Sequence, residues 1–248
     1  MILKKKLLMV SIVLMTLAAM ACGCGLSGKE QRISDIAYNK VRKHVNYVYV
    51  REGDREIPFI VAEADYQKGK TLIVRRDLLP TFRRFNDYYS YYENSEIDNY
   101  LNNEYLGELN EIDGIIEPVN IVIAAESAIG LTGKEVTKIG RKVFLLSYVE
   151  LGLAESPTVA PEGKALKIFK KSENRIACDE SGNPECYIMR SPNTYHDSMV
   201  YCMGDDAVVG GINAFDESGI RPAICVDNSA CVEKYEAAGH NSYIIKLK

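Results

Sequence analysis

The segment CYIMRSPNTYHDS, residues 186–198, contains a serine, a histidine and an aspartate, the side chains of a serine-nucleophile triad. In such a triad the histidine takes the serine proton, and the carboxylate orients the histidine. Ser191, His196 and Asp197 lie in one short segment, whereas triad members usually come from separate elements of a fold. Ser191 also precedes Pro192, which is typical of a turn. We therefore interpret the segment as a strand end and a loop, and we assign no catalytic residue.

Arg190 and Arg221 each stand in a strand-like context at a proline-containing turn, in the motifs RSP and RPA. The residue before a proline is held extended, which shapes the end of a strand. A guanidinium donates several hydrogen bonds at once, so an arginine at such a place can bind loop carbonyls or a carboxylate. We interpret both arginines as structural residues that join loops. The alternative is an anion-binding pair at a ligand groove.

Five cysteines lie in the last third of the chain: Cys178, Cys186, Cys202, Cys225 and Cys231. They flank turns or lie in apolar strands, which favours structural disulfides over a reactive thiol pair. A bond from Cys178 to Cys186 would close the turn-rich loop DESGNPE, and a bond from Cys202 to Cys225 is a second candidate. The sequence does not determine the connectivity, and an odd number leaves at least one thiol unpaired or in an intermolecular bond.

The cysteine, histidine and acidic residues do not form a recognisable metal-binding motif. The cysteines form no CxxC motif, and none of the three histidines stands at ligand spacing from a cysteine. Acidic residues occur near turns in MGDDAV, AFDES and CDESGNPE, but the sequence has no DxDxDG calcium loop. We therefore predict no metal ion and no cofactor.

The elements that must position these residues are mostly strands. Valines alternate with tyrosines in residues 46–52, and the apolar runs 57–64 and 70–79 are separated by a glycine-containing turn, which predicts three strands. The turn at residues 204–206 predicts a hairpin. The final segment, residues 242–248, is expected to pair with residues 46–52.

The middle of the chain has a helical pattern. Ser95 followed by Asp98 is typical of a helix N-terminus with its capping partner. Ile97, Leu101 and Tyr105 recur at helical spacing, which indicates a core-facing stripe. A second short helical piece is expected after Gly107.

Composition places the chain among globular proteins. The 248 residues, 47% of them hydrophobic, suffice for one sizeable core. The net charge of −4 and the dispersed lysines and arginines argue against a nucleic-acid partner. The 16 tyrosines suit both half-buried strands and binding surfaces, because their rings are apolar and their hydroxyls polar.

The N-terminus has the pattern of an exported protein. Lysines at positions 4–6 precede the apolar run LLMVSIVLMTLAAMA, which ends in small residues as a secretory signal does. The following AMACGCG resembles a bacterial lipobox, in which a cysteine is acylated and becomes the new N-terminus. Cys22 fits, and Cys24 is the alternative. We predict lipidation at Cys22 and attachment to the outer face of the cell membrane.

The expected organisation has three parts. Residues 1–21 form a signal peptide, residues 22–34 a lipid-anchored tether, and residues 35–248 a single α+β domain. The partners are then the bacterial membrane, through the lipid anchor, and a surface ligand that the sequence does not identify.

Five motifs occur in a familiar order: YYENSEIDNYLNNEYL, KVFLLSYVELG, YIMRSP, a glycine-containing hairpin, and SGIRPAI. Together they resemble a bacterial family known as domain of unknown function (DUF6273), over about Tyr47 to Asp227. Tyr92 and Tyr100 stand where tryptophan is usual in that family, and Asp98 replaces its usual arginine.

The resemblance implies a fold: α+β and C-type-lectin-like, with two short helices, a small antiparallel sheet and long loops. We expect a non-catalytic binding module at the cell envelope, for a glycan, a peptide or a surface protein. The alternatives are an enzyme or enzyme-modifying factor on the same fold, and a structural envelope protein. A tyrosine-lined concavity would favour binding, whereas a buried carboxylate, Cys or His pair converging in a cleft would favour an enzyme.

Overall fold

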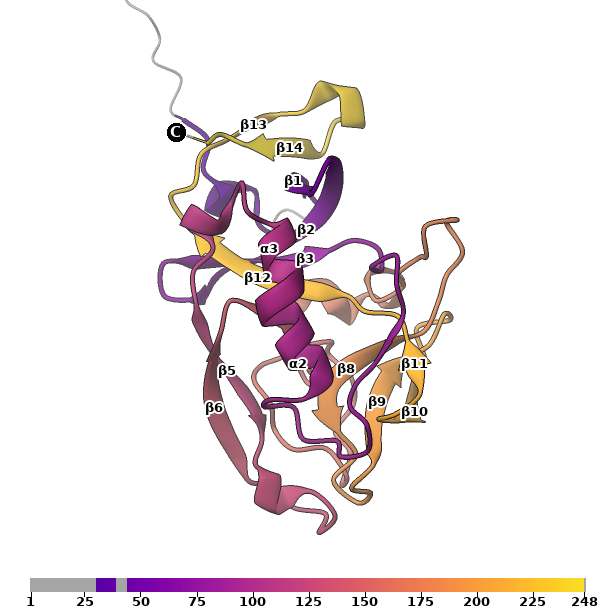
Figure 1. Ribbon diagram of the computed structural model, residues 1–248. Helices are drawn as coiled ribbons and strands as arrows, with labels where there is room; N and C mark the ends of the chain where they lie inside the picture. The colour runs from indigo at the N-terminus through magenta and orange to yellow at the C-terminus, as the bar shows by residue number, and fades with distance from the viewer. Residues whose placement is uncertain (1–29, 39–43, 248) are drawn as a thin grey trace, which may run out of the picture. The chain divides into compact units, whose positions relative to one another are not determined.

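A mixed sheet of seven strands is the largest element of the structure (Figure 1). Its strands are β1 (Tyr47–Glu52), β2 (Arg55–Gln67), β3 (Lys70–Arg75), β7 (Val143–Leu145), β12 (Pro222–Asp227), β13 (Val232–Lys234) and β14 (Ser242–Ile245). They lie in the order β13-β14-β1-β2-β3-β12-β7. Neighbouring strands are antiparallel except β1 and β14, which run parallel.

The structure is a computed structural model that describes residues 30–38 and 44–247. The predicted signal peptide and both candidate lipidation sites, Cys22 and Cys24, lie outside the described residues. Residues 31–248 form one compact unit. Ile33, in the 3₁₀ turn η1 (Ile33–Ile36), is already fully buried. Among the described residues, no helix is long and apolar enough to cross a membrane.

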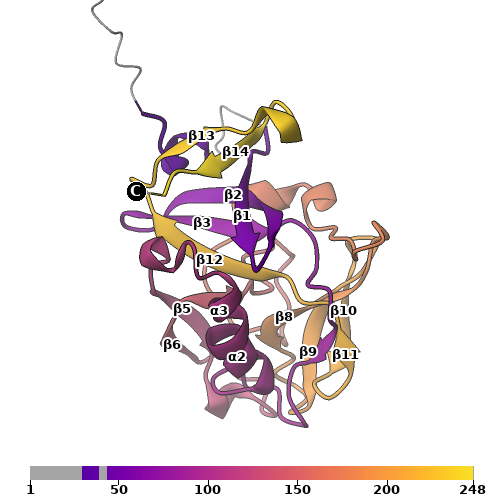
Figure 2. The same cartoon turned by 45° about the horizontal axis from the view of Figure 1, so that its top comes forward.

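The other strands form three smaller sheets. They consist of β8 (Tyr187–Pro192), β9 (Met199–Met203) and β10 (Val209–Asn213); of β5 (Val119–Ala124) and β6 (Val136–Arg141); and of β4 (Arg83–Arg84) and β11 (Glu217–Ser218). Every residue of β8 is buried, so the core extends from the large sheet into the β8–β10 sheet. Figure 2 shows these sheets below the seven-stranded sheet.

One continuous helical segment runs from Glu96 to Glu108. It consists of α2 (Glu96–Tyr100), the π-helical turn η2 (Leu101–Tyr105) and α3 (Leu106–Glu108). Ser95 Oγ accepts a hydrogen bond from the Asp98 amide at 3.2 Å, which confirms the predicted N-cap. The remaining helical pieces are the 3₁₀ turns η3 (Asp113–Ile115), η4 (Glu126–Ala128), η5 (Lys167–Lys170), η6 (Ser172–Asn174) and η7 (Glu236–Ala238).

Several predicted strands are confirmed. In β1, buried Val48 and Val50 alternate with more exposed neighbours, as a half-buried strand requires. The hairpin at residues 204–206 joins β9 to β10, and the Gly204 amide donates to the Val208 carbonyl at 2.8 Å. The expected pairing of the two ends of the chain is also present, because Tyr47 of β1 lies opposite Ser242 of β14.

The expected fold class, α+β and C-type-lectin-like with two short helices and a small antiparallel sheet, is wrong. The described chain is mostly β, with a mixed sheet of seven strands and one helical segment of 13 residues. The second helical piece expected after Gly107 forms only the end of that segment and the single turn η3. The sheet is larger than expected because β12 inserts between β3 and β7, which are far from it in the sequence.

Candidate functional site

Arg190, at the centre of β8, is fully buried. Its Nη1 donates to the Leu145 carbonyl and to Glu150 Oε2, both at 2.7 Å, and its Nε donates to the Val122 carbonyl at 3.1 Å. A buried guanidinium is tolerated only where hydrogen bonds and an opposite charge replace its water. Its Nη2 atom has no hydrogen-bond partner within the described residues.

Glu150, the ion-pair partner of Arg190, has both carboxylate oxygens occupied. Oε1 accepts from the Tyr66 hydroxyl at 2.6 Å, and Oε2 accepts from Arg190 and from the Ser147 amide at 3.1 Å. Burial and the Glu150 charge raise the pKa of Tyr66 well above its ordinary value, so the phenol remains a donor. Gly163 passes so close that a Cβ there would lie 2.9 Å from Glu150 Oε1.

A second buried carboxylate, Glu162, joins the same network. Its Oε1 accepts from the Ala124 amide at 2.8 Å, and its Oε2 accepts from the Ser191 hydroxyl. The Ser191 oxygen in turn accepts from the Tyr148 amide at 2.9 Å. Burial raises the pKa of Glu162, because desolvation penalises the charged form more than Arg190 and these donors stabilise it. Ser191 therefore has a structural partner rather than a nucleophile's base.

A cavity lies beside this network. It has a volume of about 560 Å³, and Tyr66 and Glu150 belong to its lining. The rest of the lining combines apolar residues with side chains of both charges, which include Glu63, Asp65, Lys138, Lys164 and Lys167. Glu150 is only 1% exposed, however, and each of its oxygens already accepts a hydrogen bond. A carboxylate pair thus lies near a cavity, but its members serve as acceptors for buried donors.

Arg221 makes contacts of a similar kind. Its Nε donates to the Arg75 carbonyl at 3.0 Å, and its Nη1 donates to the carbonyls of Asn174 and Arg175 at 3.2 and 3.1 Å. The guanidinium also lies 5.4 Å from the ring centroid of Tyr187. Arg190 and Arg221 do not share a ligand groove in this arrangement, and their structural role stays a prediction.

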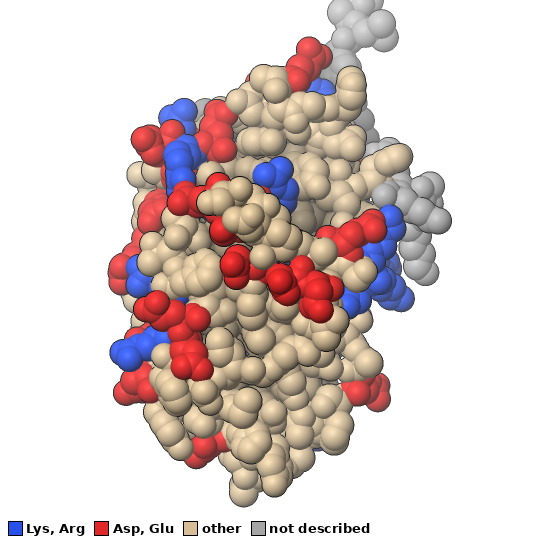
Figure 3. Space-filling model, turned by 90° about the vertical axis from the view of Figure 1, so that its right-hand side faces the viewer, with Lys and Arg blue, Asp and Glu red and all other residues tan. Residues whose placement is uncertain are grey.

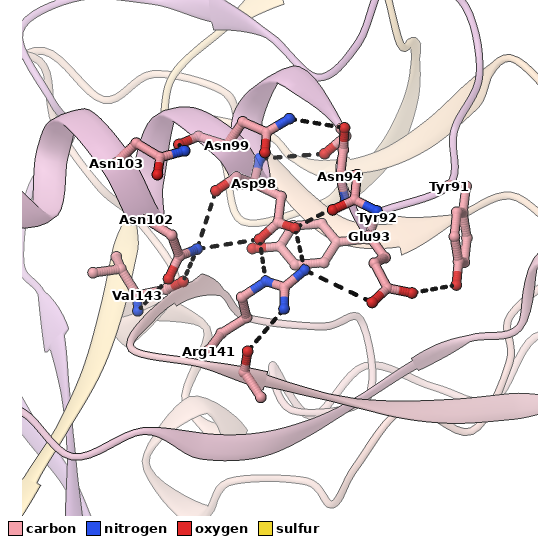
Figure 4. Close-up of polar contacts among 12 residues, drawn as sticks. Tyr91, Tyr92, Glu93, Asn94, Asp98, Asn99, Asn102, Asn103, Arg141 and Val143 are labelled. Atoms are coloured by element: carbon pink, nitrogen blue, oxygen red, sulfur yellow. Dashed lines mark hydrogen bonds and ion pairs between the residues drawn. The ribbon is translucent and has the colours of Figure 1, made fainter.

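The start of the helix is fixed to β6 by an ion pair (Figure 4). Arg141 binds Asp98 with two hydrogen bonds of 2.7 Å, a bidentate geometry that adds strength and direction. The Asp98 carboxylate also accepts a hydrogen bond from the Asn94 amide at 3.0 Å. In a capping box this carboxylate would instead accept from the amide of the N-cap residue, Ser95. Asn102 exchanges hydrogen bonds with the backbone of Val143, at 3.0 and 3.2 Å. The tyrosine-rich segment before the helix is therefore held at its C-terminal end.

Three loops meet at the end of the domain drawn lowest in Figure 1, and we call them the three-loop surface: residues 86–92, 129–133 and 193–198. The Ser90 amide donates to the Asp197 carbonyl at 2.9 Å. The Thr132 amide donates to the Thr194 carbonyl at 2.8 Å. These backbone hydrogen bonds hold the loops against one another.

The three-loop surface exposes large apolar side chains. Tyr88 is 54% exposed, Leu131 79% and Tyr195 62%. His196 packs edge-on against Tyr195, and Asp197 lies 3.4 Å from the Tyr88 hydroxyl. His196 and Asp197 therefore contact exposed tyrosines. The sequence did not reveal these contacts.

An apolar cavity of about 320 Å³ adjoins the three-loop surface. Its lining includes Tyr148, Val149, Leu153, Val159 and Pro161, together with the polar residues Lys134, Glu155 and Ser156. The Thr194 amide donates to the Thr158 carbonyl at 3.0 Å, which links the 193–198 loop to the segment that forms the cavity. Figure 3 shows that the lower half of the right-hand face of the molecule has few charged side chains.

In the described part of the chain, Cys178, Cys186, Cys202 and Cys225 are free thiols. The two pairs suggested by the sequence stay a prediction. Cys178 lies opposite Pro184, two residues before Cys186, whereas Cys225 is fully buried in β12, in a different sheet from Cys202. In the part of the chain that the structure describes, no group of three or more His, Cys, Asp or Glu side chains is placed to hold a metal ion.

Sequence reasoning missed the buried acidic residues. Glu150 and Glu162 lie in the motifs SYVELG and APEGK, where an acidic residue beside an apolar run was the available signal. It also missed a second buried pair, in which Arg75 Nε donates to Glu52 Oε1 at 2.9 Å and Tyr105 donates to the same carboxylate.

The raised pKa of Glu162 predicts a pH-dependent stability. The folded protein holds the Glu162 proton more tightly than the unfolded chain does, so this contribution to stability is fully present below the unfolded-state pKa. It decreases as the pH rises from about 4.5 towards the folded-state pKa. Urea unfolding at a series of pH values should show that the stability of the wild type, relative to Glu162→Gln, falls across this range. The exposed Glu173→Gln variant is the control, and a pH-independent difference for Glu162→Gln would contradict the assignment.

Comparison with protein-family models found a match. The family model described as domain of unknown function (DUF6273) matches residues 68–228. No curated protein and no solved structure matches the chain. The matched range extends from the β2–β3 turn to the end of β12 and so contains Arg190, Glu150 and the three-loop surface. The chain therefore belongs to the DUF6273 family.

Proposed function

We propose that this protein is a non-catalytic binding module at the cell envelope, and that the three-loop surface contacts a polypeptide ligand. The observation that carries the proposal is the cluster of Tyr88, Leu131 and Tyr195, which are exposed on loops that backbone hydrogen bonds hold together. Exposed apolar clusters on a folded domain commonly mark interaction sites.

The loops suit binding because they are pre-organised. Hydrogen bonds from Ser90 to Asp197 and from Thr132 to Thr194 fix the backbone before any ligand arrives. Ordering a flexible loop on binding costs free energy, so a fixed loop retains more of the contact energy. Tyrosine contributes a large rigid contact area with few rotatable bonds, together with one polar atom.

The adjoining apolar cavity favours a polypeptide over a glycan. Tyr148, Leu153 and Pro161 present apolar surface that an aliphatic or aromatic side chain of a ligand would cover. A side chain anchored in such a pocket is the usual source of affinity in protein interfaces. A sugar would leave many of its hydroxyls facing a lining that is mostly apolar.

The enzyme alternative is supported less well by the site. Glu150 and Glu162 are buried near a cavity, but Tyr66, Arg190 and Ser191 already occupy their oxygens. A general base needs a lone pair within reach of a substrate proton.

Binding can be tested with purified protein on arrays of short peptides and of glycans, followed by calorimetry with the best ligand. We expect a peptide with an apolar residue to bind, and Tyr195→Ala or Leu131→Ala to weaken it about tenfold. Val208→Ala is the matched control, because Val208 is also 62% exposed but lies in the β9–β10 turn. Retention of glycans alone, or wild-type affinity in both loop variants, would contradict the proposal.

We further propose that the protein is exported and attached to the membrane by a lipid on Cys22. The support is the signal-like N-terminal sequence and the lipobox-like AMACGCG.

Attachment can be tested by fractionating cells that express the full chain. The Cys22→Ser variant should leave the membrane fraction and lose incorporation of labelled fatty acid, whereas Cys24→Ser should behave as the wild type. If the double variant still sediments with membranes and carries no lipid, the lipid anchor is ruled out.

A further inference from the structure

We infer that Cys186 and Cys202 form a redox-active pair that closes to a disulfide across the β8–β9 hairpin. This pairing differs from the two that the sequence suggested, and it follows from the register of the strands.

The register places the two thiols on one face of the hairpin. Ile188 of β8 lies opposite Cys202 of β9, and Cys186 precedes Ile188 by two residues. Side chains two residues apart on a strand point to the same face, so Cys186 is a diagonal neighbour of Cys202. The two thiols lie close enough that each shifts the pKa of the other.

The surroundings leave room for the bond. Gly210 of β10 lies opposite Cys202, and a Cβ there would be 3.3 Å from Cys202 Sγ. A glycine at that position therefore keeps the space beside the sulfur open. The Ser218 hydroxyl lies 3.8 Å from Cys186 Sγ on the other side.

The two thiols have different reactivities. Cys186 is partly exposed, whereas Cys202 is 7% exposed. Hydrogen bonds from Cys202 and, to a lesser degree, from Ser218 lower the pKa of Cys186 to about 7, against the opposing effect of burial. The Cys202 thiol keeps its proton, because its pKa is raised by its hydrogen bond to Cys186 and by burial. Cys186 is thus the attacking thiol and Cys202 the resolving one.

The reaction is thiol–disulfide exchange with an external disulfide, R–S–S–R. The Cys186 thiolate attacks one sulfur, which forms a mixed disulfide and releases one R–S⁻. Cys202 gives up its proton and attacks Cys186 Sγ, which forms the Cys186–Cys202 bond and releases the second R–S⁻. Two electrons pass from the protein to the external disulfide, and the products are the internal disulfide and two R–SH after protonation.

The Cys186–Cys202 bond would restrain one loop of the three-loop surface. The hairpin between Cys186 and Cys202 contains the 193–198 loop with Tyr195, and the 186–202 ring would fix the strands on both sides of this loop. Cys225 does not compete for Cys186, because it is enclosed in β12.

The test is peptide mapping of the full chain after reduction, removal of reductant, and incubation with glutathione disulfide at neutral pH. Trypsin alone leaves Cys178 on the same peptide as Cys186, and the Arg221–Pro222 bond keeps Cys225 with Cys202. A second protease that cleaves after Asp and Glu separates these cysteines, because Glu185, Asp197 and Asp205 flank them.

We expect the peptide CYIMR, residues 186–190, to be linked to SMVYCMGD, residues 198–205, with the loss of two hydrogens. Cys202→Ser should stop at the mixed disulfide on Cys186, whereas Cys178→Ser should form the internal bond as the wild type does. Mapping the wild type needs no variant, so a folding defect cannot hide the result. A stable mixed disulfide in the wild type, a link from Cys186 to any other cysteine, or an unreacted Cys186 overturns the inference.

Discussion

The buried ion pair between Arg190 and Glu150 connects the β8–β10 sheet to the seven-stranded sheet and to the β5–β6 sheet. Arg190 lies in the β8–β10 sheet, and its hydrogen bonds reach the carbonyl of Leu145 in β7 and that of Val122 in β5. Glu150 extends the connection to Tyr66 of β2. Removing a charge of this kind from water is costly, so the network is favourable only when all these elements are in place.

The same network relates the core to the surface. Ser191, next to Arg190, accepts from the Tyr148 amide and donates to Glu162, so β8 is fixed to the segment that lines the apolar cavity. From β8 the chain continues into the loop that carries Tyr195. The Arg141–Asp98 pair has the corresponding role on the other side, where it holds the start of the helix after the tyrosine-rich loop. Rigid attachment at both sides allows exposed aromatic side chains to keep fixed positions.

Local features were predictable from the sequence, whereas non-local ones were not, except for the pairing of β1 with β14. The alternation of valine and tyrosine predicted β1, the turn at residues 204–206 predicted the β9–β10 hairpin, and Ser95 predicted the helix N-cap. Each of these features depends on residues that are neighbours in the chain. The fold class was wrong because the position of β12 between β3 and β7 is decided by tertiary packing. The sequence leaves the disulfide connectivity open for the same reason, since the neighbours of Cys186 and Cys202 depend on the strand register.

A double-mutant cycle on Arg190 and Glu150 tests this account most directly. Urea unfolding should show that Arg190→Met and Glu150→Leu each cost about 3–5 kcal/mol, because each leaves an unpaired buried charge. The double variant should be less destabilised than the sum by about 2–3 kcal/mol, because it removes both charges together. The exposed Lys171–Glu173 pair is the control and should couple by less than about 1 kcal/mol. Additivity of Arg190→Met and Glu150→Leu within about 0.5 kcal/mol would contradict the central role of the pair.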